Sequence, residues 1–250
     1  MFKKLVKHEF IASYRSYLPI YLAIIVFSFV TPLTRQIDVI QLTSAATTIL
    51  GILIGAVFFF TLYNVIISVG KRVYGKPGYL LFATPASTHQ IILSKLLVNM
   101  IWVMLSGMTT IIAILGFLLA LDITNFRDIF AAVLEIIKMF WNTGLIAVFV
   151  TGVSYLVYSI LLIMLTFAVT NAVYKGQHKI LVGFAMYFII AQVTGIITSL
   201  ISVGPLLVIF GSENIAPSNL LWFFPVIYLG LAIGFYFLVH YFVDKRLELQ

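Results

Sequence analysis

The chain of 250 residues is 62% hydrophobic and 9% charged, with a mean hydropathy of +1.14. Soluble domains carry roughly 45–50% apolar and about 25% charged residues, so this composition excludes a water-soluble globular protein. The sequence contains no cysteine, which excludes disulfides, thiolate metal sites and a cysteine nucleophile.

The first 17 residues predict a basic amphipathic helix. One face carries Phe2, Val6, Phe10, Ser13 and Tyr17, and the opposite face carries Lys4, Lys7, His8 and Arg15, with Ile11 breaking the pattern. Such a helix lies along the membrane surface with its lysines near anionic headgroups. The alternative is a basic tail that only orients the protein in the membrane. Because no small-residue cleavage site follows a short apolar core, we do not expect a removable signal peptide.

Six apolar runs predict helices that cross a hydrocarbon core of about 30 Å. They cover about residues 18–34, 48–70, 92–121, 143–174, 180–203 and 220–243. The third and fourth runs exceed the bilayer thickness, so these helices are expected to tilt or to protrude. We therefore predict an all-α membrane protein, with residues 1–250 forming one transmembrane domain of six spans.

The basic residues predict the orientation of these spans. Twelve of the fifteen lysine and arginine residues lie on the side of the termini, and the other three are Arg35, Arg127 and Lys138. Cytoplasmic loops carry the excess of basic residues, so both termini are expected in the cytoplasm. The net charge of +7 is then a topology signal rather than a nucleic-acid footprint.

The segment 122–142 predicts an external amphipathic helix rather than a seventh span, since too many charges fall within it. Its apolar half contains Ile129, Phe130, Val133, Leu134, Ile136, Ile137, Phe140 and Trp141, and its polar half contains Arg127, Asp128, Glu135 and Lys138. Asn125 is a suitable start signal. The charged half is interpreted as a solvated face.

Motif absences argue against two classes of function. No charged residue lies well inside the six runs, which argues against a proton-driven carrier, although sodium can be held by carbonyls and hydroxyls. The histidines lie scattered at the cytoplasmic boundary, and neither G-x-S-x-G nor G-x-x-x-x-G-K-[ST] is present. We expect no catalytic site, no metal and no cofactor bound by this chain.

Small and polar residues within the runs mark candidate contacts. Gly51 and Gly55, and again Gly230 and Gly234, form G-x-x-x-G patterns that let helices approach closely, within one subunit or between two. Four amides also lie in apolar runs, namely Asn64, Asn99, Asn171 and Gln192. Hydrogen bonding between helices is the ordinary explanation for them. The sharper alternative places Asn64 and Gln192 along a cargo path.

One irregular stretch, GKPGYLLFATPASTHQIILSK at residues 75–95, interrupts the apolar runs on the predicted cytoplasmic side. With its flanks it resembles the small six-span permease subunits of bacterial type-2 ABC exporters. The resemblance is carried by Arg72, Tyr74, Gly78-Tyr79-Leu80, Thr84-Pro85, Ser87 and the run Ile91 to Leu97. This chain departs from that pattern at Pro77, where the family often has an acid, and at Thr84, where it often has leucine. The alternative is a plain loop whose aromatic residues lie among the headgroups.

The resemblance implies a subunit that works as a homo- or heterodimer in the bacterial cytoplasmic membrane. Cytoplasmic ATPase subunits, which bind the ATP and magnesium, would dock on a coupling helix in the 71–91 loop, beside the N-terminal helix. The implied coupling residues are Arg72, Tyr74, Gly78, Tyr79, Leu80, Leu81, Pro85 and Ser87. The implied cargo is an amphipathic or antimicrobial peptide, a hydrophobic drug or a lipid.

Two other functions remain open at this point. A secondary carrier would work alone and would be expected to carry an embedded ionisable residue. A membrane scaffold or sensor would recruit an ATPase through the same loop without transporting anything.

Overall fold

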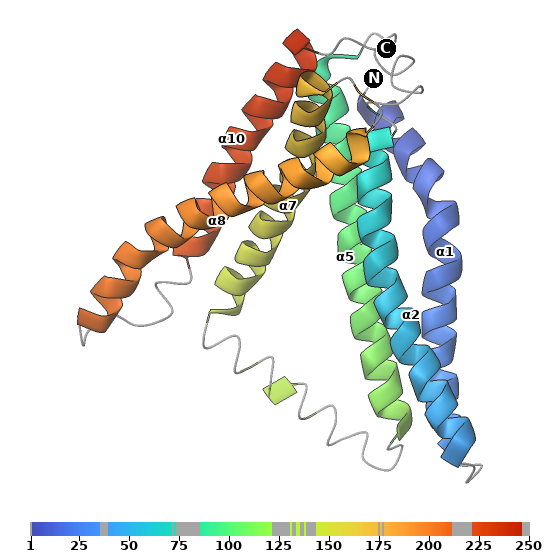
Figure 1. Cartoon of the computed structure of the whole chain (residues 1–250). Coiled ribbons are helices and arrows are strands. Elements are labelled where there is room, and N and C mark those ends of the chain that lie inside the picture. The colour runs from blue at the N-terminus through green and yellow to red at the C-terminus, as the bar shows by residue number, and fades with distance from the viewer. Residues whose placement is uncertain are drawn as a thin grey trace. The chain divides into compact units, whose positions relative to one another are not determined.

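The structure is a computed structural model. It describes residues 2–35, 40–71, 73, 86–121, 131, 134–135, 138, 144–174, 176, 178–211 and 222–246. The described part contains six long α-helices and no strand: α1 (Phe2–Arg35), α2 (Ile40–Ile66), α5 (Thr88–Leu121), α7 (Leu145–Val173), α8 (Lys179–Gly211) and α10 (Phe223–Arg246) (Figure 1). A single π-helical turn, η1 (Ile67–Lys71), continues α2.

All six helices in the described residues are long and apolar enough to cross a membrane. Each of the six helices contains most of one predicted run, so the prediction of an all-α protein with six candidate spans is confirmed at this level. Helices are favoured in hydrocarbon because every backbone N–H and C=O must find its partner within the chain.

Two of the helices extend well beyond their predicted apolar runs. Residues 1–17 were predicted as a separate interfacial helix, yet α1 runs through Pro19 as one helix of 34 residues. At ~1.5 Å per residue it is about 50 Å long, which exceeds a hydrocarbon core of about 30 Å. Its ends therefore reach headgroup depth, or the helix tilts. At the other end of the chain, α8 passes through Pro205 and ends at Gly211, beyond the predicted span limit at residue 203.

The predicted external helix lies mostly outside the described residues. Within 122–142, only Ala131, Leu134, Glu135 and Lys138 are described, and all four are helical. The position of this segment relative to the membrane stays a prediction.

The chain divides into two compact units. The α1 unit comprises residues 2–65 and 97–139, and the α7 unit comprises residues 66–96 and 140–250. Helices α2 and α5 each contribute to both units, because the divisions fall after Val65 and after Leu96.

The core of the α1 unit is an aromatic stack with a hydroxyl network beside it. The Trp102 ring stacks on Tyr17 at 4.3 Å and on Phe10 at 4.7 Å between centroids. The Ser106 hydroxyl lies 2.7 Å from the Tyr21 hydroxyl and 2.8 Å from the Thr61 hydroxyl. These contacts join α1, α2 and α5, and each of the three hydroxyls retains a hydrogen-bond partner in an apolar setting.

In the α7 unit, α7 packs against α10, α8 and η1. The Tyr158 hydroxyl of α7 lies 2.8 Å from the Thr194 hydroxyl of α8, and its ring stacks on Phe235 of α10 at 5.5 Å. Gly70 of η1 meets the ring of Phe167, which would lie 2.6 Å from a Cβ placed at this glycine. A residue larger than glycine would therefore displace η1 or Phe167.

Gly70→Ala is expected to destabilise the protein by about 1–3 kcal/mol, the usual cost of overpacking a filled site. The measurement is the thermal unfolding midpoint in detergent. Gly55→Ala in α2, the helix that η1 continues, is the control, since no described atom beyond its chain neighbours and its own helix backbone lies within 4 Å of the added methyl group. Equal midpoints for the two variants would contradict the close packing of Gly70 against Phe167.

Candidate functional site

Most of the predicted coupling residues lie outside the described residues. These are Arg72, Tyr74, Gly78, Tyr79, Leu80, Leu81 and Pro85. Both flanks of the segment are described, because η1 ends at Lys71 and α5 begins at Thr88. The predicted coupling helix must therefore lie between these two elements, in the segment 72–87.

Ser87 is the N-cap of α5. Its carbonyl oxygen accepts hydrogen bonds from the backbone N–H groups of Gln90 at 2.9 Å and Ile91 at 3.2 Å. The Ser87 hydroxyl accepts a further bond from the Gln90 N–H at 3.4 Å. Ser87 followed three residues later by Gln90 matches the capping-box pattern, a local signal for a helix start that the sequence analysis missed. The structure therefore places Ser87 at the start of α5, and its part in coupling stays a prediction.

Side chains at the start of α5 contact the end of α10. The His89 Nδ1 lies 2.6 Å from the Tyr236 hydroxyl, and the His89 and His240 rings stack at 3.9 Å between centroids. The Thr88 hydroxyl donates to Asp244 Oδ1 at 3.3 Å. We call these five residues the α5–α10 joint. The joint ties the first turn of α5 to the last turns of α10.

The sequence analysis described the boundary histidines as scattered and therefore missed this joint. His89 and Tyr236 lie 147 positions apart along the chain. A contact at that separation leaves no spacing pattern, so only the fold brings the two side chains together.

The flank before the segment is attached to α7. Within η1, Ser68 and Val69 are at most 4% exposed. Gly70 lies against Phe167 of α7, as described above. A π-helical turn inserts one extra residue into an α-helix, and such turns are frequent at functional sites. Both flanks of the segment 72–87 thus pack within the α7 unit, the first against α7 and the second against α10.

The predicted cargo residues do not share a site within either unit. Asn64 belongs to the α1 unit, and its Nδ2 donates to the Phe60 carbonyl of its own helix at 3.0 Å. Gln192 is an exposed residue of α8 in the α7 unit. Asn171 also bonds within its helix, to the Phe167 carbonyl at 2.8 Å. These bonds of Asn64 and Asn171 thus lie within one helix, and bonding of these amides between helices stays a prediction.

A small polar niche of about 170 Å³ lies between α8 and α10. It is lined by Gly195, Thr198, Ser199, Ser202, Phe224, Ile227 and Tyr228. The hydroxyls of Thr198 and Ser202 donate to carbonyls of their own helix, which leaves their oxygen lone pairs as acceptors. Tyr228 also contacts the rings of Tyr155 and Tyr158 on α7. Sequence analysis missed this niche because hydroxyl residues are common in membrane helices.

The four glycines of the G-x-x-x-G patterns make no close contact within the described chain. Apart from its chain neighbours and the backbone of its own helix, no described atom lies within 4 Å of a Cβ placed at Gly51, Gly55, Gly230 or Gly234. Close packing occurs instead at Gly70 and at Gly116, where the Ser28 hydroxyl would lie 3.1 Å from the added Cβ. A contact of the patterned glycines with another subunit stays a prediction.

The described residues contain no group of three or more histidine or acidic side chains that could hold a metal ion. Comparison with known proteins adds no relative, since no protein-family model, no curated protein and no solved structure matches this chain.

Proposed function

We propose that this protein is the membrane subunit of an ATP-driven exporter. The observation that carries the proposal is the pattern from Arg72 to Leu97, which lies on the same predicted side of the membrane as both termini. Because the sequence lacks an ATP-binding loop, the energy would come from a separate cytoplasmic ATPase that docks on the segment 72–87. Two copies, or one copy and a paralogue, would enclose the translocation path.

The attachment of the segment's flanks supports this proposal. A docking element can transmit force only if its ends are fixed to the helices that must move. Here Gly70 packs against Phe167 on one flank, and His89 contacts Tyr236 and His240 on the other. Closure of the ATPase would push the segment, and the push would pass to α7 and α10 through these contacts.

We further propose that the cargo is amphipathic: a peptide of the antimicrobial or toxin kind, a hydrophobic drug or a lipid. The chain contains 22 phenylalanine and 13 tyrosine residues, which offer large apolar contact area with polar tips on the tyrosines. The niche between α8 and α10 places hydroxyl acceptors beside Tyr228 in the same unit. Such a surface suits a molecule with one apolar and one polar face.

Co-purification from native membranes tests the proposal. We expect a cytoplasmic ATPase, and a second permease copy or paralogue, to accompany the tagged chain. Hydrolysis by the purified complex should rise when the correct class of cargo is added. A solitary protein that transports in liposomes without ATP would establish a secondary carrier instead. A complex that binds ATPase but moves no cargo would establish a scaffold or sensor.

A further inference from the structure

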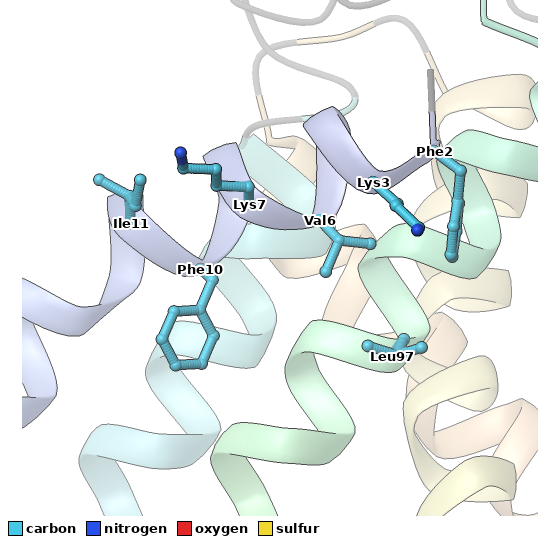
Figure 2. A pocket seen from close by; sticks show the side chains of 7 residues that line it. All are labelled: Phe2, Lys3, Val6, Lys7, Phe10, Ile11 and Leu97. Atoms are coloured by element: carbon cyan, nitrogen blue, oxygen red, sulfur yellow. The ribbon is translucent and has the colours of Figure 1, made fainter.

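An open apolar pocket lies at the N-terminal end of α1. It has a volume of about 490 Å³ and is lined by Phe2, Lys3, Val6, Lys7, Phe10, Ile11 and Leu97 (Figure 2). All seven residues belong to the α1 unit. Six come from the first three turns of α1, and Leu97 comes from α5.

The walls of the pocket combine apolar surface with two positive charges. Phe2, Val6 and Phe10 follow one another at intervals of four residues, so they form one face of α1. Figure 2 shows Val6 and Phe10 on the Leu97 side of the helix, whereas the Lys7 ammonium projects from the opposite side. Lys3 and Lys7 are exposed and one turn apart, and no acidic residue lines the pocket.

The aromatic stack of the α1 unit supports one wall of the pocket. Phe10 stacks on Trp102 with an interplanar angle of 17°, and Trp102 in turn stacks on Tyr17 with an angle of 6°. Trp102 is 5% exposed and Tyr17 is 1% exposed, so both rings are held by their surroundings. The wall is therefore formed before any ligand arrives, which lowers the entropic cost of binding.

The position of the pocket selects the kind of ligand. α1 is longer than the hydrocarbon core is thick, so its first turns, which carry the lysines, are suited to headgroup depth. A ligand at this depth that has both an apolar chain and a negative charge is a phospholipid. A free anion would gain nothing from the apolar walls, and a neutral lipid would gain nothing from the lysines.

We infer that this pocket binds an anionic phospholipid. One acyl chain lies against Phe2, Val6, Phe10 and Leu97, and the phosphate lies near Lys3 and Lys7. The inference does not depend on the proposed export function. It concerns the bound lipid of the membrane rather than cargo, and it would hold for a carrier or a scaffold.

Fluorescence of Trp102 tests the inference in the full-length protein. Trp141→Phe with Trp222→Phe leaves Trp102 as the only tryptophan, because the sequence has three. This variant is reconstituted into vesicles that contain phosphatidylglycerol or phosphatidylcholine with brominated chains, which quench tryptophan at short range. We expect brominated phosphatidylglycerol to quench Trp102 well beyond its mole fraction, and brominated phosphatidylcholine only in proportion to it.

Variants separate the pocket from general attraction to a negative surface. Lys3→Gln and Lys7→Gln should each weaken the preference for phosphatidylglycerol about fivefold, the effect of ~1 kcal/mol per basic residue. Lys4→Gln removes the same charge from an exposed side chain outside the pocket and should change the preference less than twofold. Val6→Phe keeps all charges but fills the pocket, and it should abolish the excess quenching.

Three results would overturn the inference. Equal quenching by the two lipids would show that Trp102 is reached only by the surrounding bilayer lipid, with no preference for phosphatidylglycerol. An effect of Lys4→Gln as large as that of Lys3→Gln would show general surface attraction. Protection of Trp102 by an added amphipathic peptide, in vesicles that stay intact, would reassign the pocket to a peptide.

Discussion

Tyr79→Ala combined with Leu80→Ala is expected to abolish co-purification of the ATPase while the protein still inserts in the membrane. Large side chains that fill a partner's pocket each contribute about 2 kcal/mol or more to such interfaces. Losing two of them should weaken association by roughly three orders of magnitude, since ~1.4 kcal/mol is a factor of ten. Insertion should be unaffected because the six apolar helices are unchanged. The measurement is the amount of ATPase recovered per amount of tagged protein.

The chain offers a matched control for this double variant. Leu62 and Tyr63 are the same two residue types, adjacent in α2, and are 40% and 59% exposed. Leu62→Ala with Tyr63→Ala removes the same atoms from a predicted membrane-facing position and should leave ATPase recovery unchanged. Undiminished recovery with the Tyr79 and Leu80 variant would remove the segment 72–87 as the docking site. Equal loss with both variants would point to a general effect on assembly.

His89→Ala is expected to separate ATPase binding from transport. The substitution removes a 2.6 Å hydrogen bond to Tyr236 and a ring stack on His240, while the segment 72–87 keeps its sequence. A hydrogen bond contributes about 0.5–1.5 kcal/mol and an aromatic pair a similar amount. If these contacts transmit the push to α10, cargo-stimulated hydrolysis and transport should fall about tenfold, with ATPase recovery and basal hydrolysis retained.

Two further variants show whether the α5–α10 joint itself is responsible. Tyr236→Phe removes only the hydroxyl and should have a smaller effect than His89→Ala. His178→Ala removes another exposed boundary histidine, one outside the joint, and should leave transport unchanged. Loss of ATPase recovery with His89→Ala would place His89 in the docking surface instead. Unchanged transport with this variant would exclude the joint from the route of coupling.

The boundary at residue 17 illustrates what a hydropathy pattern can predict. Charge and periodicity separate residues 1–17 from the first apolar run, yet α1 continues from Phe2 to Arg35. Extending an existing helix fixes one residue for one hydrogen bond, whereas starting a new helix is unfavourable. Hydropathy therefore indicates which residues are suited to the hydrocarbon, whereas the ends of the helix depend on where its hydrogen bonding stops.

Ser87 illustrates a local signal for a helix start that the sequence analysis did not use. The capping-box pattern of Ser87 and Gln90 lies within four residues and predicts a helix start without any knowledge of the fold. The structure confirms this start, with α5 beginning at Thr88. Local chemistry of this kind is readable from sequence because all its partners are neighbours along the chain.

The helical fold and the six candidate spans can be predicted from the amino-acid sequence, because long apolar runs can satisfy their backbone only as helices in hydrocarbon. Which faces of those helices meet cannot be predicted in this way and is seen only in the folded chain. Lipid is as apolar as leucine, so hydrophobicity does not distinguish a packed face from a lipid-facing one. The patterned Gly51 and Gly55 therefore stay open in the described chain, while Gly70 meets Phe167. The contact of His89 with His240 likewise depends on the fit of distant side chains.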